Sequence, residues 1–195
     1  MTDRKRIEYL KNIKNGKIKL MFDVFNDHGA KVATLKPVKT DDVRVGSEII
    51  DFMTKWREFY KDRFFTQFKI TNERTLDWLQ NKIMKDDNRI FFIIRDNNDR
   101  IIAHIGVIFN NKLICELDNL VKDINCKIPG VITFAEKRLI EWLFKVINIK
   151  KIIGRLFSDN IRARALHKKC GFKETKELES FNKKILLIEL KPSYI

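Results

Sequence analysis

The sequence predicts a mixed α/β (α+β) domain in which about four helices flank a central, twisted and mostly antiparallel sheet of about seven strands. Three observations lead to this fold class. Short apolar runs separated by polar turns are typical of antiparallel strands, and longer stretches with apolar residues every three or four positions are typical of helices. Toward the end of the chain the two patterns alternate, which predicts a strand–helix–strand unit and a mixed sheet. The 195 residues, 44% of them hydrophobic, suffice for one domain with a sizeable core.

The N-terminal part of the chain predicts a helix and a hairpin. Residues 1–15 are basic and are interpreted as a short helix or a frayed terminus. The strand-like runs 17–26 and 30–38 flank Asp27-His28-Gly29, a cluster typical of a turn. We expect a single domain over residues 1–195, with residues 1–30 as an N-terminal extension.

Two helices are expected next. Thr40-Asp41-Asp42 offers N-caps for a helix that runs to about Tyr60. Thr71 to Arg74 contain a capping signal for a second helix, which runs to about Met84. The apolar residues of the first helix recur at helical spacing and are Val45, Ile49, Phe52, Met53 and Trp56.

The rest of the chain predicts an antiparallel meander followed by alternating helices and strands. Short polar turns join the meander strands, and Gly171 offers a C-cap for the last helix. The expected segments are, in order, strands 89–95, 100–109 and 113–121, helix 130–146, strand 152–156, helix 160–169, and strands 172–178 and 183–190.

Composition excludes several classes of protein. The chain has no apolar run near the ~18 residues that a membrane helix needs, and its charged start lacks the features of a secretory signal. Cys115, Cys126 and Cys170 are odd in number and have no CxxC spacing, and the three histidines do not flank them at metal-site intervals. We therefore expect no metal, no disulfide and a cytoplasmic location.

The charge of the chain is its conspicuous property, since 40 Lys and Arg against 26 Asp and Glu give a net charge of +14. Such a balance favours polyanionic partners: nucleic acid, an anionic membrane or a phosphate-bearing ligand. The lysines are scattered over nearly every predicted element, without a basic arm or stripe, which argues against nucleic acid. A general bias toward Lys, Ile and Asn is an equally simple interpretation of the charge.

The segment after the third meander strand has the features of a phosphate site. A loop over residues 123–129 leads into the helix that starts near Gly130. A helix N-terminus offers unpaired N–H groups and a positive dipole end, and glycine lets a ligand approach the backbone closely. An ordinary Pro-Gly turn is the alternative interpretation.

The run from Asn160 to Phe172 resembles the motif Asn-x-x-Ala-x-x-Leu-Tyr-x-x-x-Gly-Phe of the GCN5-related N-acetyltransferases (GNAT). Five of the six marked positions match (Asn160, Ala163, Leu166, Gly171 and Phe172), and His167 replaces the tyrosine. Lys127 to Ile132 resembles in part the family's loop Gln/Arg-x-x-Gly-x-Gly/Ala, with Gly130 as the central glycine. The resemblance covers residues 31–190 and implies a GNAT-like fold with two parallel, splayed strands in the middle of the sheet.

The resemblance also implies acetyl-CoA as co-substrate. In such families the loop before the helix cradles the pyrophosphate, and the end of the first splayed strand pairs with the pantetheine arm and polarises the thioester carbonyl. Asn160 would bond the pantetheine, or cap the helix that follows it, or both. The cofactor-binding residues expected on this basis are Leu120, Val121, Lys122, Lys127, Ile128, Pro129, Gly130, Val131, Ile132, Thr133, Asn160 and Ala163.

Acyl transfer to an amine needs a base for the ammonium and an acid for the leaving thiolate. His167, at the tyrosine position of the family motif, is the predicted acid, or else it only packs on the cofactor. Glu116 and Asp118 emerge on one face of a strand, and we expect one of them to be the catalytic base. A salt bridge to a nearby Lys or Arg, or a base acting through ordered water, are the alternatives.

The acceptor is expected to lie against the N-terminal helices and their loops. Trp56, Arg57 and Phe68 combine aromatic and guanidinium groups that could stack a base or a sugar ring and clamp a diphosphate. His104, in the middle meander strand, could also reach the cleft, although a strand histidine is more often structural. Core packing of two helices is the alternative for the aromatic residues.

The stretch from Thr66 to Leu79, with Trp56-Arg57 and Glu116 to Asn119, resembles acetyltransferases of surface-polysaccharide and amino-sugar pathways. This resemblance implies a nucleotide-linked amino sugar as the small-molecule acceptor. A protein, peptide or small-amine N-acetyltransferase is the alternative, and a non-enzymatic nucleic-acid-binding protein of the same fold is the second. The sequence leaves a homodimer open.

Overall fold

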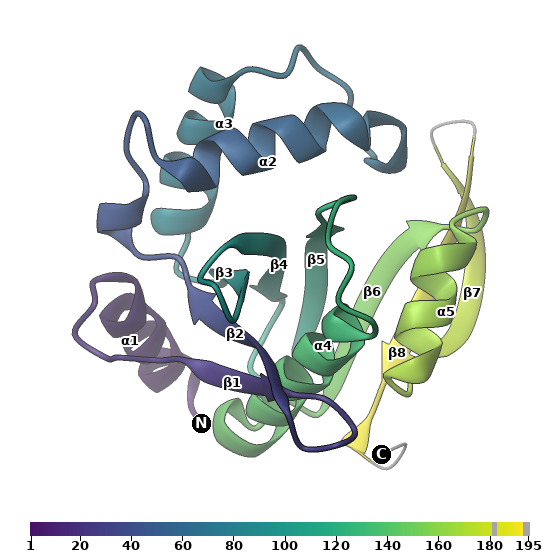
Figure 1. Cartoon of the computed structure of the whole chain (residues 1–195). Helices are drawn as coiled ribbons and strands as arrows, with labels where there is room; N and C mark the ends of the chain where they lie inside the picture. The colour runs from purple at the N-terminus through teal and green to yellow at the C-terminus, as the bar shows by residue number, and fades with distance from the viewer. Residues whose placement is uncertain (181–182, 193–195) are drawn as a thin grey trace.

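The computed structural model describes residues 1–180 and 183–192, and within them an eight-stranded sheet has the order β1-β2-β3-β4-β5-β6-β8-β7 (Figure 1). Residues 181–182 and 193–195 of the expected single domain lie outside the described part. The strands are β1 (Phe22–Phe25), β2 (Lys31–Pro37), β3 (Arg89–Asp96), β4 (Ile101–Phe109), β5 (Ile114–Lys122), β6 (Lys151–Phe157), β7 (Lys173–Ser180) and β8 (Lys183–Leu190). The α-helices are α1 (Asp3–Lys14), α2 (Glu48–Phe59), α3 (Asn72–Trp78), α4 (Val131–Trp142) and α5 (Ile161–Lys169).

The two faces of the sheet are covered by different helices, as the alternation of side chains along a strand requires. In β3, Ile90 and Phe92 pack into a core with α1 and α4, whereas Phe91 and Ile93 pack into a second core with α2 and the segment after α3. Helices α2 and α3 therefore lie on one side of the sheet, and α1 and α4 on the other (Figure 1). The predicted fold class, a mixed and mostly antiparallel sheet flanked by helices, is confirmed.

The expected pair of splayed parallel strands is β5 and β6. They pair from Ile114 opposite Lys151 to Leu117 opposite Gly154. Beyond Leu117, β5 continues beside β4 only, and beyond Gly154, β6 continues beside β8 only. The facing backbone edges of the two strand ends consequently have no ladder partner in the described residues, and a ligand can occupy that place.

The predicted start at Thr40 of the helix that runs to about Tyr60 is wrong. Residues Thr40–Asp42 form only a single 3-10 turn, and α2 begins at Glu48 after Ser47. Gly46 lies between them with φ of +75°, a left-handed conformation that interrupts a right-handed helix. Val45, counted as an apolar helix position, is 86% exposed.

Helices α3 and α4 end in π-helical turns. Leu79–Met84 extends α3, and Leu143–Ile147 extends α4, so the predicted helix ends near residues 84 and 146 are close to those observed. Leu79 and Leu143 are fully buried, one on each side of the sheet. Both π-helical segments therefore stay packed on the sheet, although their backbone hydrogen bonds change from the α-helical to the π-helical pattern.

The N-terminal segment packs into the sheet as part of one core. Leu10 and Ile13 of α1 are fully buried, and β1 pairs with β2. Lys14, at the end of α1, is also buried, and its ammonium donates hydrogen bonds to the backbone oxygens of Ile83 (2.7 Å) and Asp86 (2.6 Å). Burial lowers the pKa of Lys14 to about 8, so the side chain is still charged at neutral pH.

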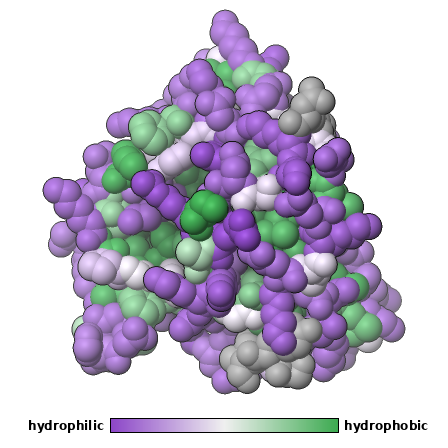
Figure 2. All heavy atoms as spheres, turned by 90° about the vertical axis from the view of Figure 1, so that its right-hand side faces the viewer, coloured by the Kyte–Doolittle hydropathy of each residue, from purple (hydrophilic) through white to green (hydrophobic). Residues whose placement is uncertain are grey.

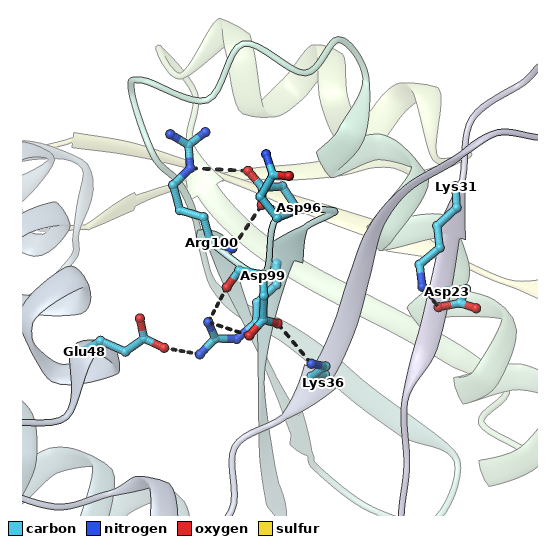
Figure 3. Close-up of polar contacts among 9 residues, drawn as sticks. Asp23, Lys31, Lys36, Glu48, Asp96, Asp99 and Arg100 are labelled. Atoms are coloured by element: carbon cyan, nitrogen blue, oxygen red, sulfur yellow. Dashed lines mark hydrogen bonds and ion pairs between the residues drawn. The ribbon is translucent and has the colours of Figure 1, made fainter.

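The start of α2 is tied to the turn between β3 and β4 by a set of charged contacts (Figure 3). Arg95 donates to the Glu48 carboxylate and, at 2.6 Å, to the backbone oxygen of Asp99. Lys36 reaches the Asp99 carboxylate at 3.2 Å and thereby lowers the pKa of that group. These contacts fix where α2 begins its path across the sheet.

The side of the molecule formed by β7 and α5 is largely hydrophilic, with hydrophobic residues in separate patches (Figure 2). Along β7 nearly every residue is exposed. Cys115, Cys126 and Cys170 are free thiols inside the fold. In the part of the chain that the structure describes, no helix is long and apolar enough to cross a bilayer.

Replacing Lys14 by Ala should lower the free energy of unfolding by about 1–3 kcal/mol, because buried backbone oxygens lose their donor. Urea denaturation measures the effect. Lys11→Ala is the matched control on the same helix, since Lys11 forms an exposed ion pair with Asp87 and should contribute about 0–1 kcal/mol. Equal losses in both variants would contradict a specific role for Lys14.

Candidate active site

A bulge in β5 lies where that strand leaves β6. His104 pairs with Val121 and Gly106 with Asp118, so Asn119 and Leu120 together face a single residue of β4. Asn119 has a positive φ of 51°. A bulge of this kind bends the strand and redirects its side chains and backbone groups, and bulges recur near active sites.

His104 is held tightly beside this bulge. Its Nδ1 lies 2.7 Å from the backbone oxygen of Asn119, and its ring packs between Trp56 and Phe91, with centroids 5.6 Å and 5.1 Å away. The residue is only 3% exposed, and burial lowers the pKa of His104 to about 4. The imidazole is therefore uncharged at neutral pH.

A cavity of about 490 Å³ opens beside His104, between the sheet and the α2–α3 side. Its lining combines positive charge with aromatic rings. The basic lining residues are Arg57, Arg74, Lys82 and Arg89, the ring-bearing ones are Phe64, Phe68, Trp78 and His104, and Met53, Thr66, Thr75 and Asn119 complete the wall.

Arg57 connects α2 to the loop that closes one side of the cavity. Its Nη2 donates to the backbone oxygen (2.6 Å) and the hydroxyl (3.0 Å) of Thr66. The guanidinium lies 3.6 Å from the Phe64 ring centroid and 4.8 Å from that of Phe68, so cation–π attraction holds the same loop. Burial lowers the pKa of Arg57, which nonetheless stays charged.

Three of the four residues expected to bind the acceptor meet in this cavity: Arg57, Phe68 and His104. Trp56 does not line it. It is 3% exposed and its ring packs against that of His104, which agrees with the core-packing alternative. Sequence reasoning missed Arg74, Lys82 and Arg89 as lining residues, because only the folded chain brings α3, its π-helical end and β3 together.

The two candidate bases, Glu116 and Asp118, have different surroundings. Glu116 accepts a hydrogen bond from Arg155 Nε at 2.7 Å, which agrees with the salt-bridge alternative. Asp118 accepts from the side-chain amide of Asn119 at 2.6 Å and lies 3.8 Å from Arg89. Burial raises the pKa of Asp118, although the Asn119 bond and Arg89 oppose the shift.

His167 lies between α4 and α5, outside the wall of the cavity. Its Nδ1 is 2.7 Å from Oε1 of Glu136, and its ring meets Phe172 edge-on at 5.3 Å. The Glu136 side chain is fully buried, and its Oε2 has no hydrogen-bond partner in the described residues. Sequence reasoning missed Glu136, although a carboxylate directly after Ala135 on the apolar face of the predicted helix was a usable signal.

The loop expected to bind a pyrophosphate has suitable geometry. Helix α4 begins at Val131, and Gly130 before it has φ of +67° and no side-chain cap. A Cβ at Gly130 would lie 2.9 Å from a ring carbon of Phe134. The first N–H groups of the helix are thus left to a ligand beside an exposed turn, which fits a phosphate group.

The cap of α5 agrees with the simpler interpretation of Asn160. Its side chain accepts a hydrogen bond from the Ala163 N–H at 3.2 Å, as an N-cap does. No group of three or more metal-ligating side chains is found among the residues that the structure describes.

Comparison with protein families matches residues 33–173 to the acetyltransferase (GNAT) domain. This match covers most of the chain, so the protein belongs to the GNAT acetyltransferase family. The expectation that it is an N-acetyltransferase is thereby confirmed. A comparison with curated proteins finds no match.

Solved structures support the fold. The spermidine N-acetyltransferase of Vibrio cholerae in complex with CoA and spermine has a TM-score of 0.70 at 19% identity, covering 83% of this chain and 96% of its own. The Campylobacter jejuni N-acetyltransferase PseH has a TM-score of 0.60 at 21% identity, covering 82% and 98%. A dodecameric form of the Vibrio cholerae enzyme gives 0.65 at 18% identity, covering 83% and 94%.

Replacing Gly130 by Ala should weaken binding of CoA, because a side chain there clashes with Phe134 and disfavours the left-handed backbone by about 1–2 kcal/mol. Titration calorimetry with CoA measures the effect. Gly29→Ala is the matched control, since Gly29 has a similar φ of +75° with open space around it. Unchanged affinity in Gly130→Ala would mean that the phosphates bind elsewhere.

Proposed function

We propose that the protein transfers the acetyl group of acetyl-CoA to the amino group of a nucleotide-linked amino sugar, in the biosynthesis of a surface polysaccharide. The observation that carries this proposal is the cavity beside His104. Its charged lining residues are all cationic, and aromatic side chains line the same cavity. Arginine and aromatic side chains suit diphosphates, sugar rings and bases.

The co-substrate side of the proposal rests on α4, α5 and the end of β5. Residues Lys127 to Thr133 would hold the pyrophosphate, and Leu120 to Lys122 the pantetheine arm, whose polar groups can pair with the free edge of β5. Asn160 and Ala163 would border the arm from the start of α5. The bound thioester supplies an activated acetyl group, and the backbone beside the bulge polarises its carbonyl.

We assign the first proton transfer to Asp118. A base for the acceptor ammonium must be ionised and yet accept a proton readily, and the raised pKa of Asp118 suits this task better than the ion-paired carboxylate of Glu116. His167, supported by Glu136, is the proposed acid for the leaving thiolate. Together these groups allow direct transfer without an acetylated enzyme.

A small-amine acceptor is the second candidate, and the likeness to an enzyme solved with spermine favours it. The charge of the cavity favours the first candidate, because spermine is a polycation and Arg57, Arg74 and Lys82 would repel it.

The acceptor class can be tested by thiol release from acetyl-CoA with a panel of amines. A nucleotide-diphosphate amino sugar should react at least about tenfold faster than spermidine, since juxtaposed like charges cost several kcal/mol. Arg74→Gln should raise KM for the sugar by about tenfold without changing CoA affinity.

Arg44→Gln serves as the matched control for that variant, because Arg44 is exposed before α2 and does not line the cavity. Faster turnover with spermidine than with any anionic acceptor would support the small-amine candidate. No thiol release with any amine, combined with no CoA binding, would reject the enzyme itself.

Asp118 should give kcat an acidic limb whose midpoint lies above the ordinary range of an aspartate, because burial raises its pKa and the base must be ionised to act. Asp118→Asn should lose this limb and lower kcat by about 10²-fold or more. Glu116→Gln should retain the limb. The measurement is kcat against pH at saturating substrates, and an unchanged limb in Asp118→Asn would move the base elsewhere.

A further inference from the structure

The tautomer of His104 follows from its one polar contact. A backbone carbonyl can only accept a hydrogen bond, so the 2.7 Å contact with Asn119 requires the proton to be on Nδ1. In a neutral imidazole the other nitrogen, Nε2, then carries a lone pair. The rings of Trp56 and Phe91 prevent the imidazole from turning over without repacking the core.

The lone pair on Nε2 faces the cavity. His104 is part of the cavity wall, and its Nε2 has no hydrogen-bond partner among the described residues. Because Nε2 is also not one of their fully buried unpaired atoms, it is accessible from the cavity. The other nitrogen-bearing side chains of the wall are charged Arg and Lys, the indole of Trp78 and the amide of Asn119, and none of these can take a proton. His104 is thus the one residue of the lining that offers a nitrogen base.

His104 is also next to the place where the acetyl group is expected. It pairs across the sheet with Val121, in the middle of the stretch Leu120 to Lys122 that we assign to the pantetheine arm and the thioester. The bulge at Asn119 and Leu120 therefore borders this stretch and also holds the imidazole, because the Asn119 carbonyl accepts the hydrogen bond from Nδ1.

We propose that His104 is a second catalytic base, which takes the second proton that the acceptor nitrogen loses while the amide bond forms. This assignment rests on the proposed function. As the amine nitrogen bonds to the carbonyl carbon, its N–H proton passes to Nε2. The C–S bond then breaks, and its electron pair leaves on sulfur, which His167 protonates.

Two bases match the two protons that an ammonium loses on becoming an amide. The first proton is removed from an alkylammonium, a weak acid, and falls to Asp118. The second is removed from a nitrogen that is already bonded to the carbonyl carbon and is far more acidic, so a weakly basic, neutral imidazole suffices to accept it. Asn119 is the positioning residue that holds Nε2 toward the substrate.

Two substitutions separate the roles of the ring nitrogens. His104→Asn keeps an amide donor where Nδ1 was and removes Nε2, whereas His104→Gln places an amide near Nε2 that accepts a hydrogen bond but cannot take a proton. Both should lower kcat by about 10²-fold or more while KM and CoA affinity stay within about twofold. His28→Asn, in the exposed turn before β2, is the matched control.

Nitrogen-15 NMR of the free wild-type protein gives a readout that needs no acceptor. At neutral pH it should show a protonated Nδ1 and an unprotonated Nε2 for His104. The imidazole signals that are absent from the spectra of both variants identify those of His104. The reverse tautomer, wild-type kcat in His104→Asn, or full activity in His104→Gln would each overturn the proposal. If the wild type acetylates no amine, the proposed function fails and this step fails with it, whatever tautomer is found.

Discussion

The parting of β5 and β6 is the constraint on which the rest of the molecule depends. Two parallel strands that pair only as far as Leu117 and Gly154 leave two backbone edges without partners in the described residues. Such edges are costly in a closed core, so the chain arranges around them a glycine-capped helix, a second helix start and a bulge at Asn119. The candidate site lies at this interruption of the sheet, and the hydrophobic core on each face holds the two strands in place.

Several charged side chains on the α2–α3 face of the sheet lie near the end of β5. Each carboxylate of β5 has an arginine beside it, Arg155 for Glu116 and Arg89 for Asp118. This pairing leaves Arg57, Arg74 and Lys82 as the excess charge of the cavity wall. The net charge of +14 by itself is compatible with nucleic-acid binding or with compositional bias. A few of its basic side chains line the cavity, while most lysines remain on solvated surfaces such as that of Figure 2.

The central strands could be predicted because a core on each face of the sheet requires continuous apolar runs such as Ile90 to Ile94. Helix α5 could be predicted because its motif runs through one short segment. The start of α2 could not, since a glycine outside the periodic pattern overrides the capping signal at Thr40. Within the site, Arg57, Phe68 and His104 were predictable by type. Their neighbours Arg74 and Arg89 were not, because the cavity is assembled from α2, the end of α3 and β3, far apart in sequence. The burial of Trp56 agrees with the apolar spacing of its helix, whereas its contact with His104 is seen only in the folded chain.

The cationic wall and the uncharged histidine act in the same direction. Positive charge around a cavity disfavours any further positive charge inside it, so the ammonium form of a bound amine is destabilised relative to the free amine that attacks. Burial lowers the pKa of His104 to about 4 and so keeps its imidazole without a proton at neutral pH. The anionic acceptor that we propose would be attracted by this positive charge, whereas a polyamine would be repelled by it. In the proposed function, selection of the acceptor and activation of its amine thus follow from one arrangement of charge.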